Sequence, residues 1–188
     1  MTNFWTNPNV EPKRGFKFVV TMTGGPTNPI EDGASWYASK ADKPRFTIQN
    51  TQHRYINHTF NYPGRLEWET VSITLVDPAT PDAAANIMGI LKAAGYNIPA
   101  NATDFSTIIS KKEAVGALGT ITVEQIGDTR NDVLETWTLN NAWVEAINFS
   151  SLDYETEELS TIEMTIRYDW ASFKNNQGAT YFQQGTQD

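Results

Sequence analysis

Two carboxylates, Glu67 and Glu69, are the first residues whose spacing could do chemistry. In an extended strand they would share one face about 6.7 Å apart, close to the separation that a pair of glycosidase carboxylates needs. No histidine or tyrosine is placed to support them, however. A half-exposed strand that alternates Glu with Leu66 and Trp68 produces the same pattern. The spacing therefore favours an ordinary strand over a catalytic pair.

The remaining candidates for a metal or catalytic site are equally weak. His53 and His58 are the only histidines, and a spacing of five places them on opposite faces of a strand and off one face of a helix. The acidic segment from Asp153 to Glu158 could offer oxygen ligands to calcium, but it lacks the spacing and the glycine of an EF-hand loop. No cysteine and no phosphate-binding glycine motif occurs. We expect no catalytic residue, no metal and no cofactor, and hence no enzyme.

Charge is concentrated in one part of the chain. The formal net charge is −8 over 188 residues. Nine carboxylates and a single basic residue, Arg167, lie between Asp132 and Asp169, which gives this segment a local balance of −8. An acidic surface repels the phosphate backbone. We therefore expect DNA to pass nearby at most, without tight binding.

Length and hydropathy bound the organisation. A chain of 188 residues fits one domain, and we expect a single domain over residues 1–173 followed by a polar tail over 174–188. No apolar run approaches the roughly 20 residues of a membrane helix. The first residues, Met1 to Trp5, show no basic start and apolar run, so we expect no export signal and no membrane association.

The elements that must position any site are mostly strands. Alternating or β-branched runs predict strands at residues 16–22, 45–56, 66–75, 120–123, 133–139, 142–149 and 161–170. Pro63-Gly64 predicts a turn. The apolar phase changes near Glu69-Thr70, which indicates a β-bulge or a strand that changes neighbours.

One long loop is expected between residues 23 and 44, where several Gly and Pro turn signals occur. It carries Trp36 and Tyr37, an aromatic pair in a polar segment. The pair could contact a partner subunit, or the loop could fold back over its own core.

One helix is clearly predicted, over residues 80–95. Thr80 is expected to cap it, with Pro81 at the first helical position and Gly95 ending it. Its apolar stripe is formed by Ala84, Ile87, Met88 and Leu91. A second short helix around residues 110–118 is a weaker possibility.

The strand at residues 161–170 has the clearest pattern. Its odd-numbered positions are polar and include Glu163, Arg167 and Asp169, whereas the even-numbered positions are apolar. Such alternation is typical of a strand with one dry and one wet face. After Phe173 the chain is polar, and we expect it to be loosely ordered unless a neighbour binds it.

A resemblance to a known family extends over residues 16–171. Its segments run Tyr62-Pro-Gly-Arg-Leu-Glu-Trp68, then Trp137-Thr-Leu-Asn-Asn-Ala-Trp143, then Leu152-Asp-Tyr154, and finally Ile162-Glu-Met-Thr-Ile-Arg-Tyr168-Asp-Trp170. This order resembles the tail tube protein of contractile-tailed bacteriophages. The acidic turn at Glu155–Glu158 and the polar tail have no counterpart in that pattern.

The resemblance implies a β-barrel or sandwich flanked by one helix, with six subunits joined into a ring whose strands form one continuous inner barrel. Rings would stack around the tape measure protein, inside a sheath, between baseplate and tail terminator proteins, and the genome would leave through the lumen. The protein would then belong to the virion after assembly in the host cytoplasm. In that picture Trp36 and Tyr37 serve ring stacking.

The wet face with Glu163, Arg167 and Asp169 either lines the lumen or points outward to the sheath; we favour the lumen. Two alternatives keep the same architecture, namely the tube subunit of a bacterial contractile injection system and a tube-initiating baseplate protein. A carbohydrate-binding β-sandwich is the alternative from another class, because it too would expose tryptophans and acidic residues without a catalytic motif.

Overall fold

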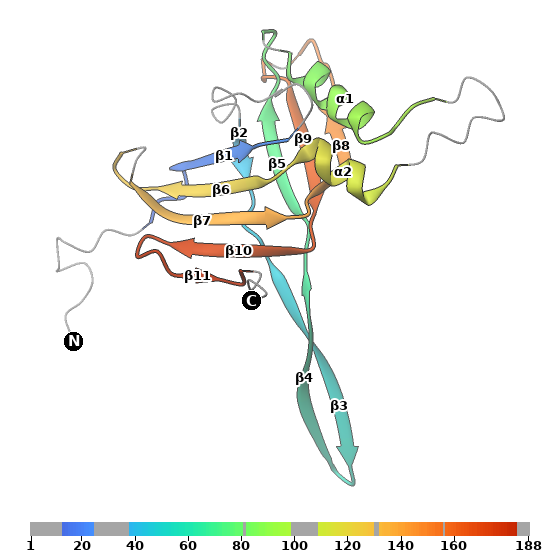
Figure 1. The fold of residues 1–188 in the computed structure, drawn as a ribbon, viewed down its shortest axis with the longest axis vertical. Coiled ribbons are helices and arrows are strands. Elements are labelled where there is room, and N and C mark those ends of the chain that lie inside the picture. Colours follow the sequence, from blue (N-terminus) through green and yellow to red (C-terminus); the bar gives the residue numbers. More distant parts are fainter. Residues whose placement is uncertain are drawn as a thin grey trace.

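The computed structural model describes residues 13–24, 38–80, 82–98, 109–129, 132–155 and 157–183. The chain is mainly β, as predicted, with two antiparallel sheets and a long hairpin (Figure 1). The five-stranded sheet contains, in spatial order, β1 (Phe18–Met22), β6 (Ile121–Ile126), β7 (Val133–Asn140), β10 (Trp170–Asn175) and β11 (Thr180–Tyr181). The four-stranded sheet contains β2 (Ala38–Ala41), β5 (Val71–Val76), β9 (Thr161–Arg167) and β8 (Trp143–Phe149). The hairpin pairs β3 (Phe46–Tyr55) with β4 (His58–Trp68).

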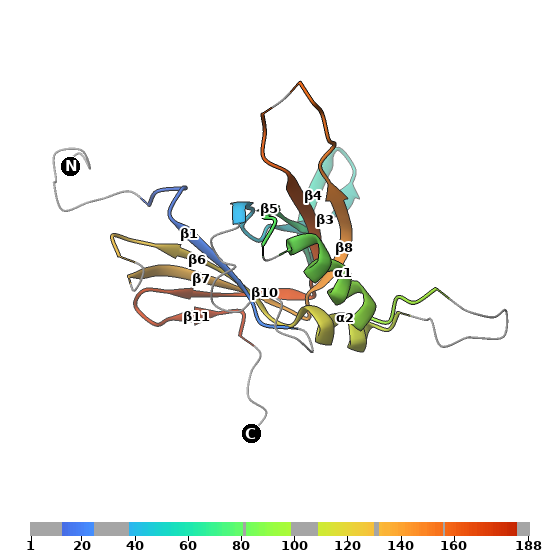
Figure 2. The same cartoon turned by 90° about the horizontal axis from the view of Figure 1, so that it is seen from above.

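One hydrophobic core joins the two sheets and both helices. Alternate side chains of the central strands are buried, because successive residues of a strand point to opposite faces. The core side chains with no exposed surface are Val71, Ile73, Ile121, Leu139, Ala142, Ile162, Ile166 and Ala171. Figure 2 shows the strands of the five-stranded sheet on one side of the molecule and the two helices on the other. Each sheet therefore buries one face and leaves the other for solvent or a partner.

The predicted helix forms as α1 (Ala83–Ala93), with different boundaries and a different buried face. Asp82, not Thr80, caps it: the Ala85 backbone N–H donates to Asp82 Oδ1 at 2.9 Å. Gly95 follows the end with φ 99°, the left-handed conformation expected of it. The predicted stripe is wrong at one position, since Met88 is exposed and Ile90 is buried beside Ile87.

The second helical segment forms as α2 (Lys111–Leu118). Ser110 caps it by accepting a hydrogen bond from the Glu113 backbone N–H at 3.2 Å. Ser followed three residues later by Glu is the capping-box signature, which is a local signal for a helix start. Its last residues, Ala117 and Leu118, are buried in the core.

The prediction of a turn at Pro63-Gly64 is wrong. Both residues lie inside β4, and the hairpin turns instead at Ile56-Asn57. The register shifts between Ile48 and Asn50, and a Cβ on Gly64 would meet the Gln49 carbonyl oxygen at 2.9 Å. The Pro-Gly pair therefore forms a β-bulge within β4. Both Pro and Gly are tolerated at bulges.

The strand does change neighbours near Glu69-Thr70, as predicted. β4 pairs only with β3, whereas β5 pairs with β2 and β9. Downstream, the single strand expected at residues 161–170 is divided. β9 ends at Arg167 and β10 begins at Trp170 in the other sheet.

The expectation of a loose segment directly after Phe173 is also wrong. β10 continues to Asn175 and then pairs with β11 in a short hairpin. The long loop expected at residues 23–44 is shortened at its end by β2, which pairs with β5.

Candidate assembly interfaces

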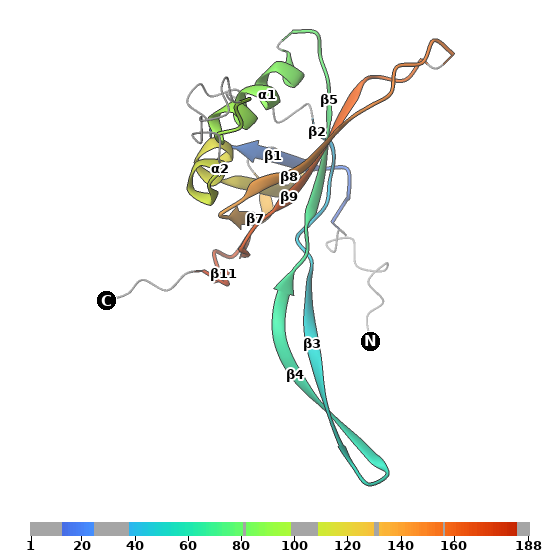
Figure 3. The same ribbon diagram turned by 90° about the vertical axis from the view of Figure 1, so that its right-hand side faces the viewer.

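The β3–β4 hairpin projects from the body with both faces exposed (Figures 1 and 3). Among its exposed side chains are seven large apolar ones: Phe46, Ile48, Tyr55, Ile56, Phe60, Tyr62 and Leu66. An isolated two-stranded hairpin is marginally stable in water. Contiguous exposed apolar surface also marks interaction sites. The hairpin therefore has the composition of a surface that another molecule covers.

The strand register shows which residues in the outer half of the hairpin share a face. Thr51 pairs with Tyr62, His53 with Phe60, and Tyr55 with His58. These pairs are two residues apart, so they share one face. The predicted separation of His53 and His58 on opposite faces is wrong, because the turn between them brings both to the same face.

An aromatic cluster fixes the base of the hairpin to the body. The Trp68 ring lies 5.3 Å from Phe46, 5.9 Å from Tyr168 and 5.9 Å from Phe182, measured between ring centroids. Burial raises the pKa of Tyr168 to about 12, so its hydroxyl stays neutral at physiological pH. The hairpin is thus anchored at one end only.

Among the described residues, no strand pairs with the outer side of β8, which forms one edge of the four-stranded sheet. Its order is β2-β5-β9-β8, and all three pairings are antiparallel. β8 therefore runs opposite to β2. The Ser150 backbone N–H donates to the Thr161 carbonyl at 2.9 Å, so in an alternating ladder the N–H of Phe149 points away from β9. Unpaired backbone groups on a seven-residue edge are a template for another strand.

The outward face of the four-stranded sheet carries Glu163 and Arg167. Both are exposed on β9: Ser72 Oγ donates to Glu163 Oε1 at 2.8 Å, and Arg167 Nη2 lies 2.9 Å from Glu145 Oε1. Figure 3 shows α1 and α2 on the other side of this sheet. The two residues therefore stand on a polar face that no helix covers.

Asp169 lies beyond the end of β9 and is held by α2. Lys111 Nζ lies 2.6 Å from Asp169 Oδ2, and Asn141 Nδ2 donates to the same oxygen at 2.8 Å. The hydrogen bond from Lys111 lowers the pKa of Asp169 against a smaller opposing effect of burial. Asp169 thus lies outside β9 and contacts α2, the helix on the other side of the sheet, so the structure separates it from Glu163 and Arg167.

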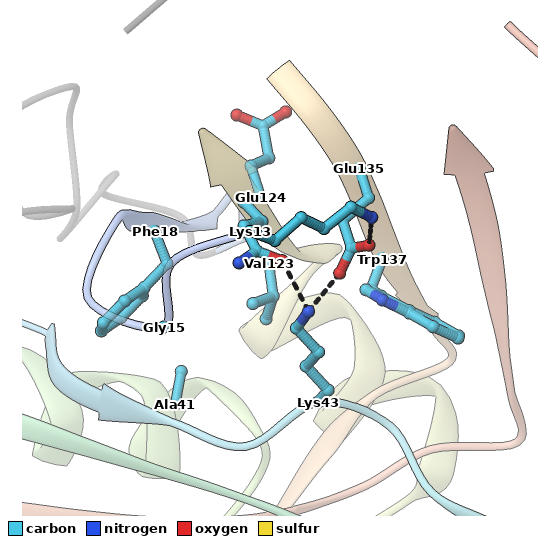
Figure 4. Close-up of a pocket in the computed structure, with 10 residues that line it drawn as sticks. Lys13, Gly15, Phe18, Ala41, Lys43, Val123, Glu124, Glu135 and Trp137 are labelled. Carbon is cyan, nitrogen blue, oxygen red and sulfur yellow. Dashed lines mark hydrogen bonds and ion pairs between the residues drawn. The ribbon is translucent and has the colours of Figure 1, made fainter. Parts of the chain in front are cut away.

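An ion-pair cluster around the buried carboxylate of Glu135, which the sequence reasoning missed, ties three segments together (Figure 4). Lys13 and Lys43 both pair with the carboxylate of Glu135 on β7, and Lys43 Nζ donates to Gln125 Oε1 at 2.7 Å. Burial alone would raise the pKa of Glu135, but the hydrogen bonds from the two lysines outweigh it and the pKa is lowered. The sequence could have indicated this cluster, because Glu135 and Leu139 are four residues apart in one strand and therefore share a face. That spacing places a carboxylate on the inward face of β7.

This cluster lines a cavity of about 320 Å³ beside Trp137, whose buried Nε1 has no hydrogen-bond partner among the residues that the structure describes. Lys43 lies between β2 and β3, so its pairing fixes the chain just before the hairpin begins. We assign the cluster to positioning the hairpin.

The other candidates from the sequence are not brought together. Glu67 accepts a hydrogen bond from Gln49 and Glu69 one from Thr47, and both carboxylates are exposed at the open hairpin. Among the described residues, no three His, Cys, Asp or Glu side chains gather as metal ligands would. Neither described helix has the length and apolarity to cross a membrane. Trp36 and Tyr37 lie outside the described residues.

Comparison with known proteins gives the fold a precedent. No protein-family model and no curated protein sequence matches the chain. Among solved structures, one chain of the extended sheath-tube complex of PVC, an extracellular contractile injection system, gives a TM-score of 0.63 at 14% identity, covering 93% of this chain and 99% of that one.

The tube-terminating cap of the anti-feeding prophage gives a TM-score of 0.62 at 15% identity, covering 93% and 99% of the two chains. A crystal structure of an Hcp protein gives 0.50 at 12% identity, covering 87% and 96%. At these identities the likeness shows the fold. The resemblance to tube proteins predicted from the sequence is confirmed at that level.

Proposed function

We propose that this chain is the tube subunit of a contractile injection machine, and that its copies join edge to edge into rings that stack into a hollow tube. The observation that carries the proposal is the open β8 edge on a four-stranded sheet with alternating strand directions. Because β8 runs opposite to β2, a copy rotated about an axis along the strands can present its β2 side antiparallel to β8. Repetition closes the sheet into a barrel and removes both open edges.

Ring closure also assigns the two faces of the sheet. The core, both helices and the five-stranded sheet all pack on one side of the four-stranded sheet. That side is too bulky to fit inside the barrel, so it must face outward. The polar face with Glu163 and Arg167 then lines the lumen, whereas Asp169 is held by Lys111 of α2 and does not belong to that face. An acidic subunit, with a formal charge of −8, suits a channel through which a polyanion passes without adhering.

The finer assignment has two forms. The sequence resemblance supports the tube of a contractile phage tail, with six subunits per ring, virion localisation, and the sheath, tape measure, baseplate and terminator proteins as partners. The similar solved structures include an extracellular contractile injection system and the anti-feeding prophage, which supports the tube of a non-phage machine instead. Both forms require the same ring.

A matched pair of variants at Phe149 tests the ring. Phe149→Pro removes an N–H that points away from β9, so the fold should survive while edge pairing fails. Phe149→Ala shortens the same side chain but keeps the N–H. We expect rings or tubes from the wild type and from Phe149→Ala by negative-stain electron microscopy, and monomers from Phe149→Pro by mass photometry.

Two results would contradict the proposal. If Phe149→Pro and Phe149→Ala assemble equally well, β8 is not the edge through which the subunits pair. A wild-type chain that stays monomeric at high concentration and binds sugars on a glycan array would instead support the carbohydrate-binding alternative.

A further inference from the structure

The hairpin differs in charge from the rest of the molecule. No Asp or Glu occurs between Phe46 and Leu66, a span that contains Arg54, Arg65 and both histidines. The chain as a whole carries −8. In the described part of the chain, the ion pairs do not include Arg54 or Arg65. The hairpin therefore presents two arginines that no described carboxylate neutralises, beside exposed aromatic side chains.

The tip of the hairpin is strained. Ile56 has φ 52° and is 84% exposed. Two-residue hairpin turns with positive φ favour Asn or Gly, and a β-branched residue in this conformation is an outlier. An exposed isoleucine in a strained turn stabilises nothing within its own chain. Its side chain gains contact only if a partner covers the tip.

A complementary surface occurs on the connection between β8 and β9. There Leu152, Tyr154 and Leu159 are the largest exposed apolar side chains, with Tyr154 fully exposed and Leu152 at 91%. They are interleaved with the carboxylates Asp153, Glu155, Glu157 and Glu158. No described ion pair involves these four acids. The connection matches the hairpin tip in apolar character and opposes it in charge.

The two surfaces cannot meet within one chain. The hairpin and the β8–β9 connection lie at opposite ends of the longest axis (Figures 1 and 3). β3 has 10 residues, so at about 3.3 Å per residue the hairpin extends about 33 Å. Such a projection can bridge from one layer of subunits to the next. Surfaces of this kind at opposite ends generate head-to-tail contacts, which extend into filaments.

We propose that the hairpin tip around Tyr55 and Ile56 docks on the β8–β9 connection of a second copy in the adjacent ring. The proposal rests on the proposed tube function and names the contact that stacks its rings. Apolar contact with Leu152 and Tyr154 would bury the strained tip, and Arg54 would face the carboxylates. Because complementary charges steer association and are screened by salt, stacking should weaken as ionic strength rises.

Cysteine cross-linking tests the contact directly, because the natural chain contains no cysteine. One preparation carries Ile56→Cys and a second carries Tyr154→Cys, both at exposed positions where substitution should leave the fold intact. The mixture is assembled and then oxidised. We expect a cross-linked dimer on non-reducing gels, in at least about tenfold excess over a control mixture of Ile56→Cys with Phe16→Cys. Phe16 is also exposed, at 72%.

Charge exchange provides an independent readout. Arg54→Glu, and Glu157→Lys with Glu158→Lys, should each raise the concentration needed for fibres by more than about tenfold, while rings still form. The combination of all three should restore fibres. Lys112→Glu on α2 makes the same charge change as Arg54→Glu and should leave stacking unchanged.

The outcomes separate the two proposals. Wild-type fibres without the Ile56–Tyr154 cross-link, or fibres unaffected by charge reversal at both sites, would overturn the docking and leave the tube function intact. A wild-type chain that forms neither rings nor fibres would overturn the tube function, and the docking with it.

Discussion

The strands β4 and β5 follow one another in the chain, yet their environments are opposite. β5 lies between β2 and β9, and its Val71, Ile73 and Leu75 side chains are buried in the core. Ten of the eleven residues of β4 are exposed, although Phe60, Tyr62 and Leu66 are among its large hydrophobic side chains. The difference is the neighbouring strand: β5 has one on each side, whereas β4 has only β3. We infer that β5 specifies the subunit and β4 specifies its assembly.

The largest expected effect tests the buried side of this comparison. Ile166→Ala empties a fully buried position opposite Val71 and should lower the free energy of unfolding by about 3 to 4 kcal/mol. Ile48→Ala, at a half-exposed side chain of the hairpin, should cost less than about 1 kcal/mol. Urea titration of the monomer measures both. Similar losses would mean that the hairpin is packed within its own chain.

A smaller effect is expected at the cluster that fixes the chain ahead of the hairpin. Glu135→Gln should lower the free energy of unfolding by about 2 kcal/mol at neutral pH, because two charged hydrogen bonds are lost. The pKa of Glu135 is lowered from 4.5 by Lys13 and Lys43 against the opposing effect of burial. Its contribution is therefore complete above pH 4.5 and is lost as the pH falls through the lower, folded-state pKa.

Unfolding measured between pH 3 and 7 should show this acid-linked loss in the wild type and much less of it in Glu135→Gln. Asp169→Asn serves as the control, since its ion pair with Lys111 is about half-exposed and contributes little. A wild type whose stability does not change below pH 4.5 would argue against a paired Glu135.

The smallest effect on stability should be a gain. Ile56→Asn places a residue that tolerates positive φ at the hairpin turn and should raise the free energy of unfolding by about 1 kcal/mol. The same change removes the apolar side chain at the tip, so fibres should form less readily than from the wild type. Thermal unfolding and fibre sedimentation measure the two effects. A variant that is more stable and stacks as well as the wild type would show that the tip makes no contact.

Most strands were predictable because their signal is local. Alternation at residues 161–167 and 120–123, and the reversal of apolar phase at residues 69–70, follow from the two-residue period of a strand with one buried face. The capping box at Ser110 and the left-handed conformation of Gly95 are likewise local signals, because each depends only on residues close by in the sequence. The resemblance to tube proteins depended on the order of such segments.

What the sequence by itself determined, then, is most of the strands, the fold class and the acidic balance, since each depends on residue type and short-range spacing. The tertiary structure decided which strands have neighbours. Only it shows that Pro63-Gly64 is a bulge within a strand, that the chain changes sheets after Tyr168, and that Glu135 meets lysines from two distant segments. Pairing between residues far apart in the sequence, such as Phe18 with Gln125, depends on where the chain has already folded, and no short-range pattern records it.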